Sequence, residues 1–349
     1  MTSHPNHEYI STKEASPVSD LFVAGVGVHL SPVETAEEAI AAGRYDPESA
    51  ASDQVLSVCV EPERYPAEMA VLAAREAVAM AQAEPDSFRA VFHTYVDYQG
   101  ARYWQAGPYV AQNAIGPAVP SFDVVQECNG QMGAMELGRR FVTGPDDRVL
   151  VTTADRFDHP WVSRWYADQS VLGDGGAAVV LSGAGGFARV ASLVTMAENS
   201  LEGEARGSGF HSGSDLSTVD FDQLRKEFHD DVPLLEHYAR METLIHSGVE
   251  RALSDAGITR SELTWAIPAM TTKWRVEITL DRFLGLPLER STWELGRRTG
   301  HIGGGDQIVG LHHLVTTGAL HPGDRVLLLG GGTGYTLTVA VLEITDAVA

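Results

Sequence analysis

The stretches PDDRVLVTTAD at residues 145–155 and PGDRVLLLGGGTG at residues 322–334 begin in nearly the same way. Each starts with a proline after a helix-ending glycine and continues into an apolar run that is typical of a buried strand. A helix-like stretch precedes each of them, at 126–144 and at 299–321. The chain is therefore expected to contain one order of helices and strands twice.

Earlier segments follow the same order. An amphipathic helix is predicted at 67–82, before the apolar run 89–96, and a second helix at 241–257, before a short strand at 264–270. Strands that alternate with helices indicate α/β layers. We expect one half at 20–184 and the other at 185–349, with an irregular insertion at 195–235 near the entrance to the site. Residues 1–19 are predicted to form a flexible N-terminal lead-in.

Composition indicates a folded protein that does not bind nucleic acid. The 349 residues are 44% hydrophobic and 21% charged, which is ordinary for a folded protein with a substantial core. Acidic residues outnumber basic ones 47 to 25, giving a net charge of −22 without any basic block. Nucleic acid is therefore not an expected partner, because binding it requires clustered positive charge.

Cysteine count and hydropathy bear on location. Cys59 and Cys128 are too few for a disulfide framework, which favours a reducing cytoplasm. No apolar run approaches the roughly 20 residues that span a bilayer, and the polar N-terminus lacks the pattern of a signal peptide. We expect a cytoplasmic protein without a membrane segment.

The repeat places Cys128 and His301 at equivalent positions, each at the start of the helix that precedes its DRVL strand. A helix start carries partial positive charge, which favours thiolate over thiol. If two such halves pack about a pseudo-twofold axis, both side chains can reach one site. Cys59, in LSVCVEP, has no such context and is expected to be structural.

Four segments in one order resemble the ketosynthase III superfamily of thiolase-fold proteins: SFDVVQECNGQMGAMELG, VLVTTADRF, SVLGDGGAAVVLSG and HPGDRVLLLGGGTGYTLTVAVLEI. The resemblance runs from about residue 20 to the C-terminus. It implies a five-layer αβαβα homodimer whose cysteine is acylated by a thioester donor. The donor would be acyl-CoA or an acyl carrier protein, as a co-substrate, with no other cofactor.

Two departures from the condensing members of this superfamily bear on the reaction. Their His-Gln-Ala-Asn segment is replaced by IPAMTTKWR, with Ala269 nearest the histidine position, and their helix-start asparagine is replaced by His301. The missing pair normally supports decarboxylation of a malonyl unit, so condensation is not expected. Cys128, His301 and Asp306 remain as nucleophile, general base and orienting acid.

This set is similar to ketosynthase III-like acyltransferases of natural-product pathways, including polyketide and antibiotic biosynthesis. We expect a ping-pong transfer of a short acyl group, such as malonyl, through acyl-Cys128 to a hydroxyl on a sugar or aglycone. Three alternatives stay open: transfer between carrier proteins, a divergent ketosynthase that makes a C–C bond, and a non-catalytic partner subunit.

The resemblance also suggests supporting residues. The amides of Cys128 and a residue near Thr333 would form the oxyanion hole, Trp104 would shape the acyl pocket, and Arg164 with Trp165 would contact CoA. A core or surface role is the alternative for Trp104 and for the Arg164–Trp165 pair. No metal is expected, because neither HExxH nor a cysteine pair occurs and His312 and His313 point to different faces of a helix. The glycines at 173–178 and 330–334 lack the context of a nucleotide-binding loop.

Overall fold

A mixed nine-stranded sheet runs through the computed structural model, which describes residues 20–167, 170–210 and 217–345. The expected flexible lead-in, 1–19, lies outside the described residues. The strand order is β5-β4-β6-β7-β1-β8-β11-β10-β9, and β2 and β3 form a separate pair. The strands are β1 Phe22–Leu30, β2 Val33–Thr35, β3 Ser57–Cys59, β4 Phe88–Thr94, β5 Ser121–Val124, β6 Arg148–Asp155, β7 Gly175–Ser182, β8 Ala188–Ala197, β9 Trp265–Ile267, β10 Arg325–Gly332 and β11 Thr336–Ile344.

The described α-helices are α1 Ala36–Ala41, α2 Pro47–Asp53, α3 Pro66–Met80, α4 Ala106–Ala114, α5 Gly130–Gly138, α6 Phe221–Asp231, α7 Leu234–Ala256, α8 Lys273–Ile278, α9 Trp293–Thr299 and α10 Asp306–Thr316. The predicted helix at 241–257 corresponds to the C-terminal part of α7, which begins at Leu234, about two turns earlier. The strand predicted at 264–270 is confirmed as β9.

Strand order on one side of the β1–β8 pair mirrors the order on the other. Outward from the pair, β7, β6 and β4 follow on one side, and β11, β10 and β9 on the other. The repeated DRVL strands are β6 and β10, and each lies third from the middle. This order is what duplication of one unit produces. The division at residues 184 and 185 stays a prediction, and it falls in the connection between β7 and β8.

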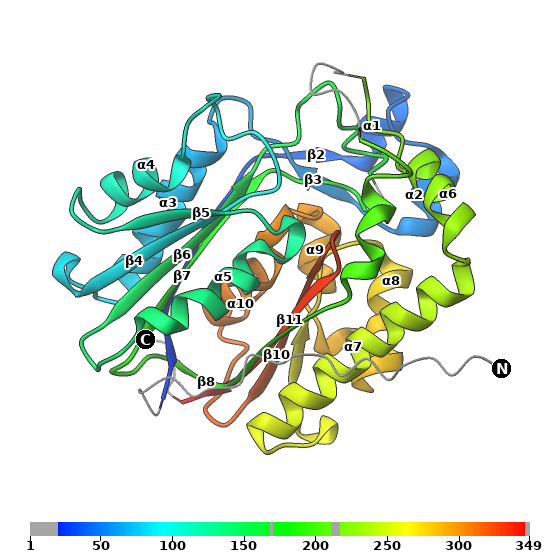
Figure 1. Ribbon diagram of the computed structural model, residues 1–349. Helices are drawn as coiled ribbons and strands as arrows, with labels where there is room; N and C mark the ends of the chain where they lie inside the picture. Colours follow the sequence, from blue (N-terminus) through cyan, green and yellow to red (C-terminus); the bar gives the residue numbers. More distant parts are fainter. Residues whose placement is uncertain (1–19, 168–169, 211–216, 346–349) are drawn as a thin grey trace.

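The sheet folds around two central helices. Both α5 and α10 contact strands of both halves, whereas α3 covers β1, β6 and β7 from outside and α7 covers β8 and β11. Figure 1 shows α3 and α4 on one outer side of the molecule, α7 on the other, and α5 with α10 between the strands. The layers thus alternate helix, sheet, helix, sheet, helix, which confirms the predicted α/β architecture.

Small side chains bring α3 close to β1. The helix presents Ala73, Ala74 and Ala77 to the sheet, and all three are fully buried. Opposite them, Gly27 has no space for a side chain, since an added Cβ would lie 2.2 Å from the carbonyl oxygen of Ala73. The alanines of the helix and the glycine of the facing strand together therefore allow α3 to pack directly against β1.

The prediction for 195–235 needs correction. This segment is not an irregular insertion where the structure describes it, because it contains the end of β8, a 3₁₀ turn at Asn199–Ala205, α6 and the start of α7. The glycines and charged residues of this segment favoured a loop prediction, and α6 was missed because it contains few apolar residues. Residues 211–216 lie outside the described part.

Among the described residues, no helix combines the length and the apolar character that crossing a membrane requires.

Replacing Gly27 with alanine is expected to lower the free energy of unfolding by about 1–3 kcal/mol, because the new methyl group forces α3 away from β1. Denaturant unfolding of the purified chain measures this change. Gly209→Ala is the matched control, since nothing lies within 4 Å of a Cβ added there. Equal stability of the two variants would contradict the close packing described here.

Candidate active site

Cys128 lies in a 3₁₀ turn, Glu127–Asn129, that leads from β5 into α5. Glu127 has a φ of 49°, in the left-handed region that residues other than glycine seldom occupy. Such backbone strain persists only where the surroundings hold it in place. The turn places the Cys128 thiol at the positive end of α5, as the sequence indicated.

His301 comes from the opposite half and meets Cys128 directly. Its Nε2 lies 2.9 Å from Cys128 Sγ, and its Nδ1 donates a hydrogen bond of 2.5 Å to Asp306 Oδ2. The 3₁₀ turn Gly303–Gly305 carries the chain from His301 into α10, where Asp306 is the first residue. The structure therefore brings the three predicted catalytic residues into one hydrogen-bonded series.

Asp306 is held from two further directions. Its Oδ2 also accepts the amide of Met270, at 2.5 Å, and its Oδ1 accepts the amide of Ile302, at 3.0 Å. The carboxylate is fully buried. Because three donors surround it, Asp306 cannot rotate, and the proton on His301 stays at Nδ1 with Nε2 directed at sulfur.

The charge state of His301 follows from these partners. Burial by itself lowers the pKa of the imidazolium, but the negative charges and hydrogen bonds of Asp306 and Cys128 outweigh burial and hold that pKa well above its usual range. The imidazole Nε2, at 2.9 Å, can donate a hydrogen bond to the sulfur. The pair is suited to nucleophilic attack by Cys128.

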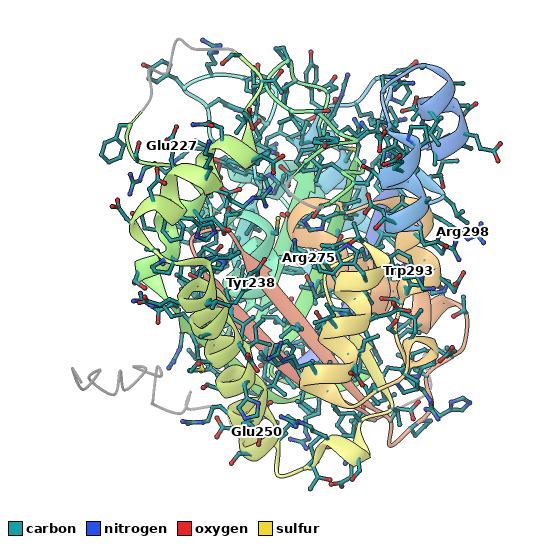
Figure 2. All side chains as sticks on the ribbon, turned by 90° about the vertical axis from the view of Figure 1, so that its right-hand side faces the viewer. Glu227, Tyr238, Glu250, Arg275, Trp293 and Arg298 are labelled. Carbon is teal, nitrogen blue, oxygen red and sulfur yellow. The ribbon has the colours of Figure 1, made fainter. Side chains whose placement is uncertain are left out.

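A cavity of about 290 Å³ opens onto Cys128 and His301. Its walls come from the β9–α8 loop, α6, α7, α8 and the end of β10, and Ala269 of that loop is one of the lining residues. Tyr238 of α7 and Arg275 of α8 line it, and Figure 2 shows these two residues on neighbouring helices. Position 269 carries a methyl group and no imidazole, and the histidine that contacts Cys128 is His301.

Thr333, predicted near the oxyanion hole, lies in the cavity wall. The preceding Gly332 packs against the turn that carries Cys128, since a Cβ added there would lie 2.9 Å from the Asn129 amide nitrogen and 3.1 Å from that of Cys128. Any side chain at 332 would therefore crowd that amide. The role of these amides as oxyanion donors stays a prediction.

Arg164 and Trp165, which were predicted to contact CoA, have partners within the chain, and the CoA contact stays a prediction. Arg164 donates to both carboxylate oxygens of the buried Asp174, at 2.7 and 3.0 Å. Trp165 is 3% exposed, and its Nε1 donates to Glu34. Arg164 thus pairs with a residue ten positions away, and Trp165 pairs with one 131 positions away.

Trp104 does not line the cavity of its own chain. It is 40% exposed and packs edge-on against Tyr109, with ring centroids 5.8 Å apart. A role in shaping an acyl pocket across a dimer interface stays a prediction.

Sequence reasoning missed three carboxyl groups behind Cys128: Asp97, Glu127 and Asp155. Burial and the charge of Asp97 raise the pKa of Glu127 to about 7, while burial, opposed by two amide donors, holds the pKa of Asp155 well above its usual range. A signal was present, because Asp155 ends β6 and Asp97 follows β4, its parallel neighbour. The carboxyl ends of parallel strands meet at one sheet edge.

Comparison with known proteins points to one family. Residues 122–198 match the family model of 3-oxoacyl-[acyl-carrier-protein] synthase III, and residues 253–344 match the model of its C-terminal region. A beta-ketoacyl-[acyl-carrier-protein] synthase III of Streptomyces coelicolor is 28% identical over 288 residues, covering 79% of this chain and 82% of the relative.

Two solved structures extend the comparison. ChlB3, described as an acyltransferase, superposes with a TM-score of 0.90 and 32% identity over 94% of this chain and 99% of its own. The priming β-ketosynthase of the R1128 polyketide pathway gives a TM-score of 0.74 at 20% identity, covering 96% and 99% of the two chains. At 20% identity, the similarity to the priming β-ketosynthase shows a shared fold alone.

Replacing His301 with alanine is expected to slow alkylation of Cys128 by iodoacetamide at pH 6 by at least about tenfold, because a cysteine without a charged partner is almost entirely protonated at that pH. Mass spectrometry of the labelled peptide measures the rate. His321→Ala is the control, since that side chain is 77% exposed and contacts Asp324 only weakly.

Cys59 should not interfere with this measurement. It is 2% exposed, and burial raises the pKa of its thiol to about 11. A His301→Ala variant that is alkylated at the wild-type rate would show that the imidazole does not activate the thiol.

Proposed function

Because the chain belongs to the ketosynthase III-like thiolase-fold proteins, which are acyl-transferring or condensing enzymes, we propose that it is an acyltransferase that works through acyl-Cys128. The acyl group is short, such as malonyl, and the acceptor is a hydroxyl on a sugar or aglycone of a natural product. The donor is a thioester of CoA or of an acyl carrier protein. The observation that carries the proposal is the hydrogen-bonded series of Cys128, His301 and Asp306.

In the first half-reaction, the Cys128 thiolate attacks the thioester carbonyl and forms a tetrahedral intermediate. The intermediate collapses, the C–S bond to the donor breaks, and the departing thiolate takes the proton from His301 Nε2. Acyl-Cys128 no longer carries a negative charge. One of the causes that raised the pKa of His301 has then disappeared, so the neutral imidazole persists as a base.

In the second half-reaction, His301 Nε2 accepts the proton of the acceptor hydroxyl as its oxygen attacks the acyl-cysteine. The new C–O bond forms, the C–S bond breaks, and the Cys128 thiolate returns beside the imidazolium. Asp306 holds the ring in one orientation throughout. The same proton site thus serves both half-reactions, and no external acid is needed.

A condensing ketosynthase is the second candidate, because the Streptomyces coelicolor relative carries that name. Condensation of a malonyl unit requires stabilisation of an enolate oxygen. Ala269 offers no donor side chain in the cavity wall, and the other reactive position is taken by the His301–Asp306 pair. This chemistry favours transfer without loss of carbon dioxide.

Incubation with malonyl-CoA is expected to yield a malonyl adduct on Cys128 that keeps its carboxylate. Intact-mass spectrometry identifies the adduct, and Cys128→Ala should form none. An adduct that has lost carbon dioxide would contradict the acyltransferase proposal and support condensation. If malonyl-CoA leaves the chain unmodified, other acyl-CoAs and malonyl-acyl carrier protein take its place in the same assay.

Replacing His301 with alanine is expected to leave acyl-Cys128 detectable but to slow release of the acyl group to a hydroxyl acceptor by roughly 10²–10⁴-fold, the range typical of general-base catalysis. Decay of the adduct mass with added acceptor alcohols measures the second step alone. Wild-type decay in this variant would remove His301 from the base role.

We further propose that the protein is a homodimer in the cytoplasm. β5 is the edge strand of the sheet, and four exposed apolar side chains lie on it or near it: Phe122, Val125, Leu137 and Phe141. An unpaired edge with apolar flanks is a surface that a second copy can cover. Both cysteines are free thiols, which suits a reducing compartment.

The double variant Phe122→Asp, Val125→Asp is expected to sediment as a monomer at concentrations where the wild type is a dimer, because two buried charges would oppose the interface. Leu235→Asp is the control, since Leu235 is 85% exposed on α7 on the other side of the molecule. A variant that stays dimeric would exclude the β5 edge as the interface.

A further inference from the structure

The cavity that opens onto Cys128 carries a second group of reactive side chains: Glu204, His229 and His237. They come from the 3₁₀ turn Asn199–Ala205, from α6 and from α7. One ligand atom from each residue lies within 4.8 Å of the other two. These residues have no part in the acyl transfer described above.

His229 is in the tautomer that binds a metal ion. Its Nδ1 lies 2.9 Å from the carbonyl oxygen of Val232, and a carbonyl can only accept a hydrogen bond. The proton of the neutral ring is therefore on Nδ1, and Nε2 carries a lone pair. Metal-binding histidines are commonly oriented in this way by a carbonyl acceptor.

His237 is the buried member of the group. It is 2% exposed and packs edge-on against the rings of Phe228, Tyr238 and Tyr335. Its Nδ1 is buried without a hydrogen-bond partner among the described residues, and its Nε2 lies 3.6 Å from Glu204 Oε1. The Nε2 atom is therefore the His237 nitrogen that faces Glu204.

Charge around His237 suits a metal ligand as well. Arg225 also lines the cavity, but its guanidinium is paired with Asp222 at 2.8 Å. Glu204 supplies a negative charge.

We propose that Glu204, His229 and His237 bind a divalent transition-metal ion of the Zn²⁺ class in the wall of the Cys128 cavity. Two imidazoles and one carboxylate form a donor set that suits this class. Ligand atoms about 2.0–2.2 Å from an ion lie roughly 3.3 Å apart, close to the observed 3.6 Å between His237 and Glu204.

Three protein ligands leave a coordination position free, and all three residues face the cavity. That position can hold an oxygen atom of the acyl acceptor, which would bind the acceptor opposite the acyl-cysteine. This role rests on the proposed acyl transfer, whereas the metal site itself does not. Sequence reasoning missed the group because its members lie far apart and form no metal-binding motif.

The test is Zn²⁺ binding to the full chain after treatment with a chelator and dialysis. Isothermal titration and elemental analysis are expected to show a single site in the wild type, in Cys128→Ser and in His246→Ala. His246 is the matched control because it is an exposed histidine on α7, the helix that carries His237. Glu204→Gln and His229→Ala are expected to bind Zn²⁺ at least about tenfold more weakly.

Circular dichroism without metal shows whether these variants are folded, and Glu204→Gln keeps the shape of the side chain. Loss of binding in Cys128→Ser, with binding retained in His229→Ala, would place the ion on the catalytic pair and overturn the proposal. Absence of binding by the folded wild type would overturn it too, leaving the three residues as metal-free hydrogen-bonding groups. Neither result depends on whether acyl-Cys128 forms, so failure here is distinguishable from failure of the proposed reaction.

Discussion

The contact of 2.9 Å between Cys128 Sγ and His301 Nε2 is the constraint on which the site depends, because its two members come from opposite halves of the chain. It requires two helix starts to approach each other across the interior. The 3₁₀ turns at Glu127–Asn129 and Gly303–Gly305 contact one another, and glycines at the second turn leave room for the first. Mirrored strand orders bring α5 and α10 into the same central layer.

Asp306 connects this contact with the rest of the protein. Its carboxylate accepts hydrogen bonds from His301, from the amide of Ile302 and from the amide of Met270 in the loop after β9. The same loop contributes Ala269 to the cavity wall. The residue that accepts a hydrogen bond from His301 therefore also holds the loop that carries Ala269. One buried carboxylate connects the His301 ring with the cavity wall.

The cavity divides into two chemically different ends. Cys128 and His301 form one end, where sulfur and an imidazole nitrogen lie 2.9 Å apart, and Glu204, His229 and His237 form a polar group elsewhere in the wall. Apolar residues of α7, including Met241, Leu244 and Ile245, line the space as well. A cavity of about 290 Å³ with this lining suits a small acyl group and a polar acceptor better than a long chain.

The sequence by itself predicted the α/β class and the repeated strands, and the repeat together with the family resemblance pointed to Cys128, His301 and Asp306. Strands, turns and helix starts can be read from neighbouring residues. Contacts between distant segments were decided only by the tertiary structure. Arg164 and Trp165 were predicted to contact CoA, with a surface role as the alternative, and only the tertiary structure pairs Trp165 with Glu34, 131 positions away. The Glu204, His229 and His237 group depends likewise on how three separate elements pack, and α6 lay within a segment whose composition predicted a loop. The contact between Cys128 and His301 joins residues 173 positions apart, and the Glu204, His229 and His237 group joins three separate elements. No local sequence pattern records such contacts.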